Sequence, residues 1–381
     1  MDNKEIYTER ISCIFCKSNN FDCLFKDDTY NIPLGCYTVN TISNKKFYNM
    51  PFNILKCKDC FTYQTKFLGN MDIIYDYNAL SHGTIRSTMD TTFANFITDD
   101  KIINNIKNII EIGGGNGGLS DIILENCNNI NYTIIDPTYS GTNKNKTIIK
   151  DYLEKISFEK IVADTVVMSH VFEHFYEPTE ILNNFKNNKN IKHIYLNFPN
   201  LESYIKNNNY HVLNPEHIYY VNNQFIINLF QKYGFCLEKT YYHEEHSVLF
   251  SFKRNDTYID DKIINNTSDE VIQFFDNIQN KIKSIVDVIS KNMNNKVYIW
   301  PCSMHTTYLL SLGLEKQIKL DAILDNAPHK INKYLYGFKY KCLSFNEILN
   351  KNENSIIILN GGCYNIEVIN NNKNNSNIIF I

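Results

Sequence analysis

Short apolar runs alternate with longer amphipathic stretches between residues 108 and 254. Runs of this length bounded by polar and turn residues are typical of buried strands, and their alternation with helical stretches predicts an α/β sheet. The segment before them, residues 71–100, is expected to be largely helical. The predicted strands are NIIEIGG (108–114), NYTIID (131–136), KTIIKDY (146–152), ADTVVMSH (163–170), KHIYLNFP (192–199) and HSVLFSFKR (246–254).

A helix-like stretch follows, within residues 257–294. Its apolar residues recur at helical spacing and form one stripe, which indicates a helix packed between domains. These residues are Val271, Phe274, Phe275, Ile278, Ile282, Ile285 and Ile289. A second α/β unit is predicted after it, from strand-like KVYIWPC (296–302), helix-like HTTYLLSLGL (305–314), and strand-like LDAILD (320–325) and SIIILNGG (355–362).

These patterns divide the chain into several domains, as its length of 381 residues also suggests. We expect a cysteine-rich domain over residues 1–66, a central α/β domain over 67–256, the helical connector over 257–294 and a C-terminal Rossmann-like α/β domain over 295–381. The oligomeric state stays open.

The composition excludes some classes of protein. A net charge of −3 gives no basic field for a nucleic acid partner. The first residues, MDNKEIYTER, contain no apolar core of a secretory signal, and no apolar run approaches the roughly 18 residues of a membrane span. Eleven cysteines, an odd number, argue against a disulfide framework and for a reducing compartment. We therefore expect a cytoplasmic protein without a membrane partner.

Two C-x-x-C pairs near the N-terminus are candidate metal ligands. Cys13 and Cys16 form one pair, and Cys57 and Cys60 form the other. Four thiolates brought to one point suit tetrahedral zinc, and a shell closed by four protein ligands is typical of a structural Zn²⁺ site. Redox-active or simply reduced cysteines are the alternative interpretation.

A glycine-rich turn follows the first strand of the central domain. Gly113, Gly115 and Gly117 stand where a strand gives way to a helix, and glycines there let the backbone turn tightly and approach a ligand. Asp136 ends the next strand, where its carboxylate could accept both ribose hydroxyls of a bound nucleoside. NAD and S-adenosyl-L-methionine are both compatible with this pattern.

Two further features bear on this choice of cofactor. Glu111 is an acid placed just before the glycines, which favours S-adenosyl-L-methionine over NAD. Asp151 and Tyr152 follow the third strand, where adenine could lie. A turn residue at the end of a strand is the alternative interpretation of both Asp136 and Asp151.

With these motifs the chain resembles class I methyltransferases, and more closely the sugar C-methyltransferases of deoxysugar biosynthesis. The resemblance rests on the paired C-x-x-C motifs and on YDYNALSHGTIRSTM (75–89), HVFEH (170–174), PEHIYY (215–220), LDAILDNAPHKINKYLYGF (320–338) and ILNGGCYNIEVI (358–369). It implies a class I methyltransferase Rossmann-like sheet between a small N-terminal zinc-binding domain and a C-terminal α/β domain. The substrate implied is a nucleotide-diphosphate sugar.

The resemblance also implies catalytic residues. Glu216 and His217 match the family's Glu-His pair, His174 matches another active-site histidine, and Tyr77 matches a tyrosine near the sulfonium. His217 is the preferred base, since histidine titrates near neutral pH. Asn214 departs from the family, which has a tyrosine there, and this change leaves the acceptor atom open.

The predicted reaction is C-methylation of a nucleotide-linked deoxy keto sugar through an enolate. Such a reaction needs a base beside the ketone and donors that stabilise the developing oxyanion. O- or N-methylation of an amino sugar or another small metabolite is the alternative, and a non-catalytic binding protein is a second one.

Overall fold

The computed structural model describes residues 5–25, 31–35, 38–40, 47–76, 84–99, 106–127, 129–158, 161–256, 270–351, 353–361, 365–372 and 375–381. Among the helices of these segments, none combines the length and apolar character needed to cross a membrane.

The N-terminal part is built from short antiparallel strands, which are β1 (Tyr7–Glu9), β2 (Phe21–Cys23), β3 (Asn31–Pro33), β4 (Thr38–Val39), β5 (Asn49–Pro51), β6 (Ile54–Cys57), β7 (Tyr63–Thr65) and β8 (Phe67–Gly69). β2, β6 and β7 form one sheet with β14 (Tyr219–Tyr220), a strand from the middle of the chain. α1 (Met71–Asp76) and α2 (Thr84–Thr98) then lead into the central sheet.

The central sheet is largely parallel, as the alternating pattern predicts. Its order is β11–β10–β9–β12–β13–β16–β15, and β16 alone runs in the opposite direction, antiparallel to both β13 and β15. This order departs at its last strands from the dinucleotide-binding order 3-2-1-4-5-6. The strands are β9 (Asn108–Ile112), β10 (Asn131–Ile135), β11 (Lys146–Ile149), β12 (Thr165–Ser169), β13 (His193–Pro199), β15 (Phe235–His243) and β16 (Ser247–Arg254).

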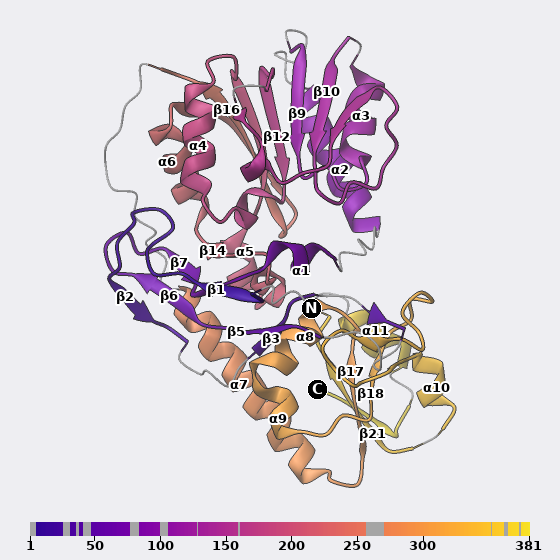
Figure 1. Ribbon diagram of the computed structural model, residues 1–381. Coiled ribbons are helices and arrows are strands. Elements are labelled where there is room, and N and C mark those ends of the chain that lie inside the picture. The colour runs from indigo at the N-terminus through magenta and orange to yellow at the C-terminus, as the bar shows by residue number, and fades with distance from the viewer. Residues whose placement is uncertain are drawn as a thin grey trace.

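Helices cover both faces of this sheet (Figure 1). Alternate residues of each strand face opposite sides, so the sheet buries two apolar layers. α2 and α3 (Gly118–Asn126) pack on one face, and α4 (Pro178–Asn187) and α6 (Asn223–Lys232) pack on the other. Shorter helical turns, η2 (Leu153–Lys155), η4 (Phe172–His174), α5 (Leu201–Lys206) and η5 (Tyr210–Leu213), follow strands or precede β14.

A second sheet follows α7 (Glu270–Lys291). It is parallel throughout, in the order β20–β18–β17–β21–β22. Its elements are β17 (Lys296–Trp300), α8 (Met304–Leu309), η6 (Leu310–Leu314), α9 (Glu315–Gln317), β18 (Ala322–Leu324), β20 (Cys342–Leu343), α10 (Phe345–Leu349), β21 (Ser355–Leu359), α11 (Asn365–Asn372) and β22 (Ile378–Phe380), while β19 (Tyr334–Leu335) pairs with β4.

One apolar core joins the N-terminal strands to this second sheet. The stripe of α7 predicted from the sequence is buried at Val271, Phe274, Phe275, Ile278, Ile282 and Ile285. It packs in a cluster with Phe52 of the N-terminal part and Ile299 of β17. The N-terminal strands and the second sheet therefore share one core, and both lie below the central sheet in Figure 1.

Candidate active site

The glycine-rich turn lies at the carboxyl end of β9, as the sequence indicates. Gly113, Gly115 and Gly117 all have positive φ angles, of 75°, 56° and 82°. Only glycine adopts this backbone region at no steric cost. A Cβ atom on Gly113 would also lie 2.2 Å from Cγ2 of Val171, so this position excludes any side chain.

Asp136 closes this turn from the end of β10. One carboxylate oxygen accepts a hydrogen bond from the backbone N–H of Gly115 at 2.7 Å. The other accepts from the backbone and the hydroxyl of Thr138, at 2.7 and 3.1 Å. Three of about four acceptor positions are thus used, so two ribose hydroxyls can be accepted only if one of the Thr138 contacts breaks.

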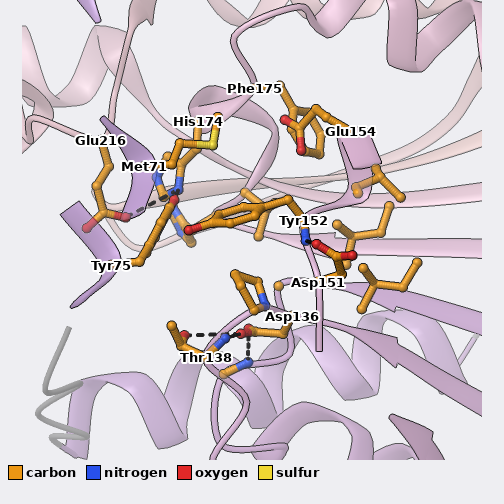
Figure 2. A pocket seen from close by; sticks show the side chains of 18 of the residues that line it. Met71, Tyr75, Asp136, Thr138, Asp151, Tyr152, Glu154, His174, Phe175 and Glu216 are labelled. Atoms are coloured by element: carbon orange, nitrogen blue, oxygen red, sulfur yellow. Dashed lines mark hydrogen bonds and ion pairs between the residues drawn. The ribbon is translucent and has the colours of Figure 1, made fainter. Parts of the chain in front are cut away.

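A pocket whose empty space, open solvent included, is about 780 Å³ opens above the turn. Gly113, Gly115 and Asp136 line it beside Asp151 and Tyr152. In Figure 2, Asp136 and Thr138 lie toward one end, His174, Tyr75 and Glu216 toward the other, and the ring of Tyr152 extends between them.

Two of the predicted cofactor residues do not line the pocket. Glu111 is buried under the turn, where its carboxylate accepts a hydrogen bond from the hydroxyl of Tyr132 at 3.0 Å. Gly117 packs against Tyr139 instead. Both residues support the shape of the turn in this structure. Their predicted contact with a cofactor stays a prediction.

The far end of the pocket gathers three polar side chains from distant segments. Nδ1 of His174 lies 3.3 Å from the hydroxyl of Tyr75 on α1 and 3.4 Å from a carboxylate oxygen of Glu216. All three residues line the pocket. Burial lowers the pKa of His174 to about 3, with a smaller contribution from His170, and raises the pKa of Tyr75 well above its ordinary value. At neutral pH both groups are therefore uncharged.

A second layer lies behind His174. The carboxylate of Glu173, fully buried, is 3.1 Å from Nδ1 of His170 and 3.7 Å from Nε2 of His217. Nδ1 of His217 donates to the carbonyl of Val212 at 3.1 Å. Burial raises the pKa of Glu173 to about 7, although His217 opposes the shift. His217, the preferred base from the sequence, is 7% exposed and does not line the pocket.

Tyr77, the fourth predicted catalytic residue, lies outside the described residues, so its role stays a prediction. Sequence reasoning missed Tyr75, which lies two residues earlier and reaches His174. The available signal was the YDY pattern itself, because both tyrosines stand at the start of the segment that resembles the sugar methyltransferases. It also missed Met71, which lines the pocket from the first turn of α1.

The four predicted metal ligands come together, with all four sulfur atoms within 4.8 Å of one another. Sγ of Cys13 lies 3.5 Å from that of Cys60, and Sγ of Cys16 lies 3.5 Å from that of Cys57. Tetrahedral zinc with Zn–S bonds of about 2.3 Å requires sulfur separations of about 3.8 Å. The donor set and its spacing therefore fit zinc.

The two C-x-x-C turns also share one backbone geometry. The residue after each second cysteine has a left-handed conformation, with φ of 61° at Lys17 and 59° at Phe61. Its N–H donates to the carbonyl of the first cysteine, at 3.0 Å in one turn and 2.9 Å in the other. Hydrogen bonding from Cys60 is the main cause of the lowered pKa of Cys13, so the protein favours a thiolate within this pair.

The cysteine cluster is tied to the far end of the pocket by a strand pairing. β14 pairs with β7, placing Tyr219 opposite Gln64 and Tyr220 opposite Tyr63. β7 begins three residues after Cys60, and β14 begins two residues after His217. A metal ion that fixes the cysteine cluster would therefore also help to fix, through this strand pairing, the segment that carries Glu216.

Comparison with known proteins identifies the central sheet. Residues 86–240 match a family described as "Methyltransferase domain". The chain carries an S-adenosylmethionine-dependent methyltransferase domain. This domain contains the glycine turn, Asp136 and two of the three polar groups of the far end, His174 and Glu216. No curated protein matches the chain.

Solved structures similar to the methyltransferase domain are distant. An O-methyltransferase family protein from Burkholderia thailandensis has 12% identity and a TM-score of 0.36, over 45% of this chain and 57% of its own. The mitomycin 7-O-methyltransferase MmcR has 15% identity and a TM-score of 0.34, over 44% and 54%. The plantazolicin methyltransferase BpumL, in complex with a triazolic desmethylPZN analogue and SAH, has 14% identity and a TM-score of 0.36, over 45% and 90%. The chain thus spans little more than half the length of the first two.

Proposed function

We propose that the protein methylates a carbon atom of a nucleotide-linked deoxy keto sugar. The observation that carries the proposal is the cluster of Tyr75, His174 and Glu216 at the end of the pocket opposite Asp136. A carbon acid needs a base and an oxyanion donor side by side, and this cluster offers both.

The base would be His174, held by Glu216. The neutral imidazole would take a proton from the carbon beside the ketone, and the electron pair of that C–H bond would pass to the carbonyl oxygen. Burial makes this imidazole a weak base, so the carboxylate of Glu216, 3.4 Å from its Nδ1, would have to stabilise the imidazolium as it forms. The phenol of Tyr75 stays protonated, because burial raises its pKa, and would donate to the resulting enolate oxygen. The glycine turn, with Asp136, Asp151 and Tyr152, would hold S-adenosylmethionine. When bound there, S-adenosylmethionine would supply an electrophilic methyl group for the enolate carbon.

His217 would act from behind, as a positioning residue. Its contacts to Val212 and Glu173 would hold the segment that carries Glu216 at the far end of the pocket, which we call the acceptor end because the methyl acceptor would bind there. Tyr77 belongs to the same proposal as a further polar group near the sulfonium. Tyr75 would take over the phenolic role that Asn214 lacks.

Zinc held by Cys13, Cys16, Cys57 and Cys60 would be structural. Four thiolates leave no open coordination position for chemistry. We infer that residues 1–66 fix the acceptor end and that residues 67–256 bind the methyl donor. Residues 295–381, which follow the helical connector at 257–294, would contribute to substrate binding. Thiolate ligands need a reducing environment, which is our reason for proposing a cytoplasmic location.

The competing proposal is O- or N-methylation of an amino sugar or another small metabolite. Asn214 favours it, since the family's phenol is missing at that position. Such a reaction needs a base only for the attacking hydroxyl or amine, and no enolate forms.

Solvent deuterium exchange separates the two reactions. The enzyme would be incubated in D₂O with S-adenosylhomocysteine and nucleotide-linked 4-keto and 3-keto deoxy sugars, and the sugar carbons followed by NMR. C-methylation predicts exchange beside the ketone, followed by a new C–CH₃ resonance once S-adenosylmethionine replaces the product. Methyl transfer without exchange, to give an O–CH₃ or N–CH₃ signal, would support the competitor.

A further inference from the structure

A chain of hydrogen bonds leads from the buried carboxyl of Glu173 to the surface. One oxygen of Glu173 lies 3.1 Å from Nδ1 of His170, and Nε2 of His170 lies 2.9 Å from Oγ of Ser247 at the start of β16. Oγ of Ser247 lies in turn 2.5 Å from Nδ1 of His246. Glu173 and Ser247 are buried, whereas His246 is partly exposed in the turn between β15 and β16. We call these four residues the relay.

The backbone of the relay is strained at His170. Its φ angle is 53°, in the left-handed region that residues other than glycine rarely adopt. Such outliers cluster at functional sites, where the surroundings hold them in place. Both ring nitrogens of His170 are held, by Glu173 and by Ser247, and its backbone N–H donates to the carbonyl of Asn197 at 3.0 Å. The strained conformation is therefore the one that joins Glu173 to β16.

Two buried atoms between Glu173 and His174 lack a partner. Oε2 of Glu173 and Nε2 of His174 make no hydrogen bond within the described part of the chain. One carboxylate oxygen of Glu173 and one ring nitrogen each of His174 and His217 lie within 4.8 Å of one another. Since Nδ1 of His174 lies beside Tyr75 and Glu216, the neutral base carries its proton on Nε2. Buried groups are nearly always satisfied, so this donor and this acceptor need a reason to stay apart.

The surroundings of Glu173 allow it to gain or lose a proton near neutral pH. Burial raises its pKa to about 7, and the charge of His217 opposes that shift. Burial, with a smaller contribution from Glu173, also raises the pKa of Tyr204 and of Tyr219, so both phenols stay uncharged. The titratable groups around this carboxyl are His170, His174, His217, Tyr204 and Tyr219.

We propose that Glu173 is a proton reservoir for His174 and that the relay empties and refills it. As Nδ1 of His174 takes the proton of the substrate carbon, the proton on Glu173 passes to Nδ1 of His170. The Nε2 proton of His170 passes to Ser247, and the hydroxyl proton of Ser247 passes to His246, which becomes an imidazolium at the surface. The carboxylate left on Glu173 pairs with the Nε2–H of the His174 imidazolium. One proton enters the buried cluster and one leaves it, so its net charge does not change.

The exchange makes the buried imidazole a stronger base. Burial lowers the pKa of His174, and an opposite charge close by favours the protonated form. Glu216 supplies one carboxylate at Nδ1, and the ionised Glu173 supplies a second near Nε2. When the products leave, His174 releases its proton to the open pocket and the relay returns one to Glu173. Glu173 acts through His174, as a positioning residue, and the inference rests on the proposed function because it follows the proton of the substrate C–H bond.

Three variants of the full-length protein test the reservoir. Glu173→Gln keeps the size of the neutral carboxyl but has no proton to release. Ser247→Ala interrupts the relay and leaves Glu173 in place. Ser251→Ala is the matched control, because it removes an equally buried hydroxyl from β16 that makes no hydrogen bond among the described residues. The measurement is deuterium exchange beside the ketone of the nucleotide-linked keto sugars with S-adenosylhomocysteine bound, and thermal unfolding shows that each variant has folded.

We expect Glu173→Gln to lower the exchange rate about 100-fold and Ser247→Ala to lower it about tenfold, with KM for the keto sugar little changed. Ser251→Ala should exchange at the wild-type rate. The wild-type rate should rise with pH through about 7, because Glu173 is then ionised before the reaction begins. That rise should be absent in Glu173→Gln and present in Glu173→Asp, which keeps a carboxyl. A merely structural role for Glu173 would leave the pH profile unchanged.

The wild-type pH profile in Glu173→Gln, or equal rates in Ser247→Ala and Ser251→Ala, would overturn the inference. Infrared difference spectra of wild type and Glu173→Gln below pH 7 add a measurement that needs no substrate. They should contain the C=O stretch of one protonated carboxyl, and its absence would also overturn the inference. Failure of the proposed function is distinct, since the wild type would then show this carboxyl band but no exchange at any pH.

Discussion

The hydroxyl of Tyr75 and Nδ1 of His174 lie 3.3 Å apart, although 99 residues separate them along the chain. The contact brings α1, before the methyltransferase domain, onto the turn that follows β12. Both groups are uncharged near neutral pH, because burial shifts their pKa values in opposite directions. A neutral phenol beside a neutral imidazole can stabilise a developing oxyanion while the imidazole takes a proton.

Tyr75→Phe tests the phenol. Loss of one oxyanion donor should lower kcat for methyl transfer about 100-fold, while KM for S-adenosylmethionine changes little. The matched control is Tyr241→Phe, which removes the hydroxyl of a half-exposed tyrosine on β15. Steady-state kinetics that show the same kcat for both variants would remove Tyr75 from the mechanism.

His174→Asn and His217→Asn separate the residue that lines the pocket from the one behind it. Deuterium exchange beside the ketone should be lost about 1,000-fold in His174→Asn, in the range reported for a general base, and should fall less in His217→Asn. The reverse order would make His217 the base and would restore the preference drawn from the sequence.

Glu173 should make stability depend on pH. The folded chain holds its proton up to about pH 7, whereas the unfolded chain releases it near the ordinary value of 4.5. The stabilisation from that proton is therefore complete below pH 4.5 and is lost as pH rises through 7.

Urea unfolding of wild type and Glu173→Gln measures this loss. The wild type should lose about 2 to 3 kcal/mol relative to the variant between pH 5 and pH 8. The lowered pKa of His174 has the opposite effect, because the free energy of unfolding decreases as pH falls below 6.5. The wild type and Glu173→Gln both contain His174, so this effect cancels in the comparison. A pH-independent difference would mean that Glu173 is already ionised.

Much of the central sheet was predictable because its signals are local. The apolar runs that became β9, β10, β11, β12, β13 and β16 were all identified from their pattern. β15 was missed, since it lies at the edge of the sheet and its exposed residues blur the alternation. The glycine turn and the C-x-x-C pairs were predictable because backbone angles and ligand spacing depend on neighbouring residues.

The acceptor end of the pocket was harder to predict. The sequence marked His174, Glu216 and His217 as one group, but it could not say which of them faces the pocket. Which of these side chains faces the pocket depends on the turn at η4 and on the pairing of β14 with β7, which joins segments more than 150 residues apart. Tyr75 was missed for the same reason, since its partner lies far along the chain.

Removal of the metal tests the cysteine cluster. Cys57→Ser should lose zinc and lower Tm by roughly 10 °C, because the metal contributes folding energy to a segment with little core of its own. Cys236→Ser, on β15 and outside the cluster, is the control. The checks are metal analysis of the purified protein and thermal unfolding with and without a chelator. A zinc-free wild type with an unchanged Tm would contradict the assignment.

The central claim is that the glycine turn and Asp136 hold the methyl donor, and calorimetry with S-adenosylhomocysteine tests it most directly. Asp164→Asn is the matched control for Asp136→Asn, because Asp164 caps the opposite end of the same sheet. We predict one molecule bound per chain, with affinity lowered about tenfold or more in Asp136→Asn and unchanged in Asp164→Asn. No heat of binding by the wild type, or equal affinity in Asp136→Asn, would contradict the account.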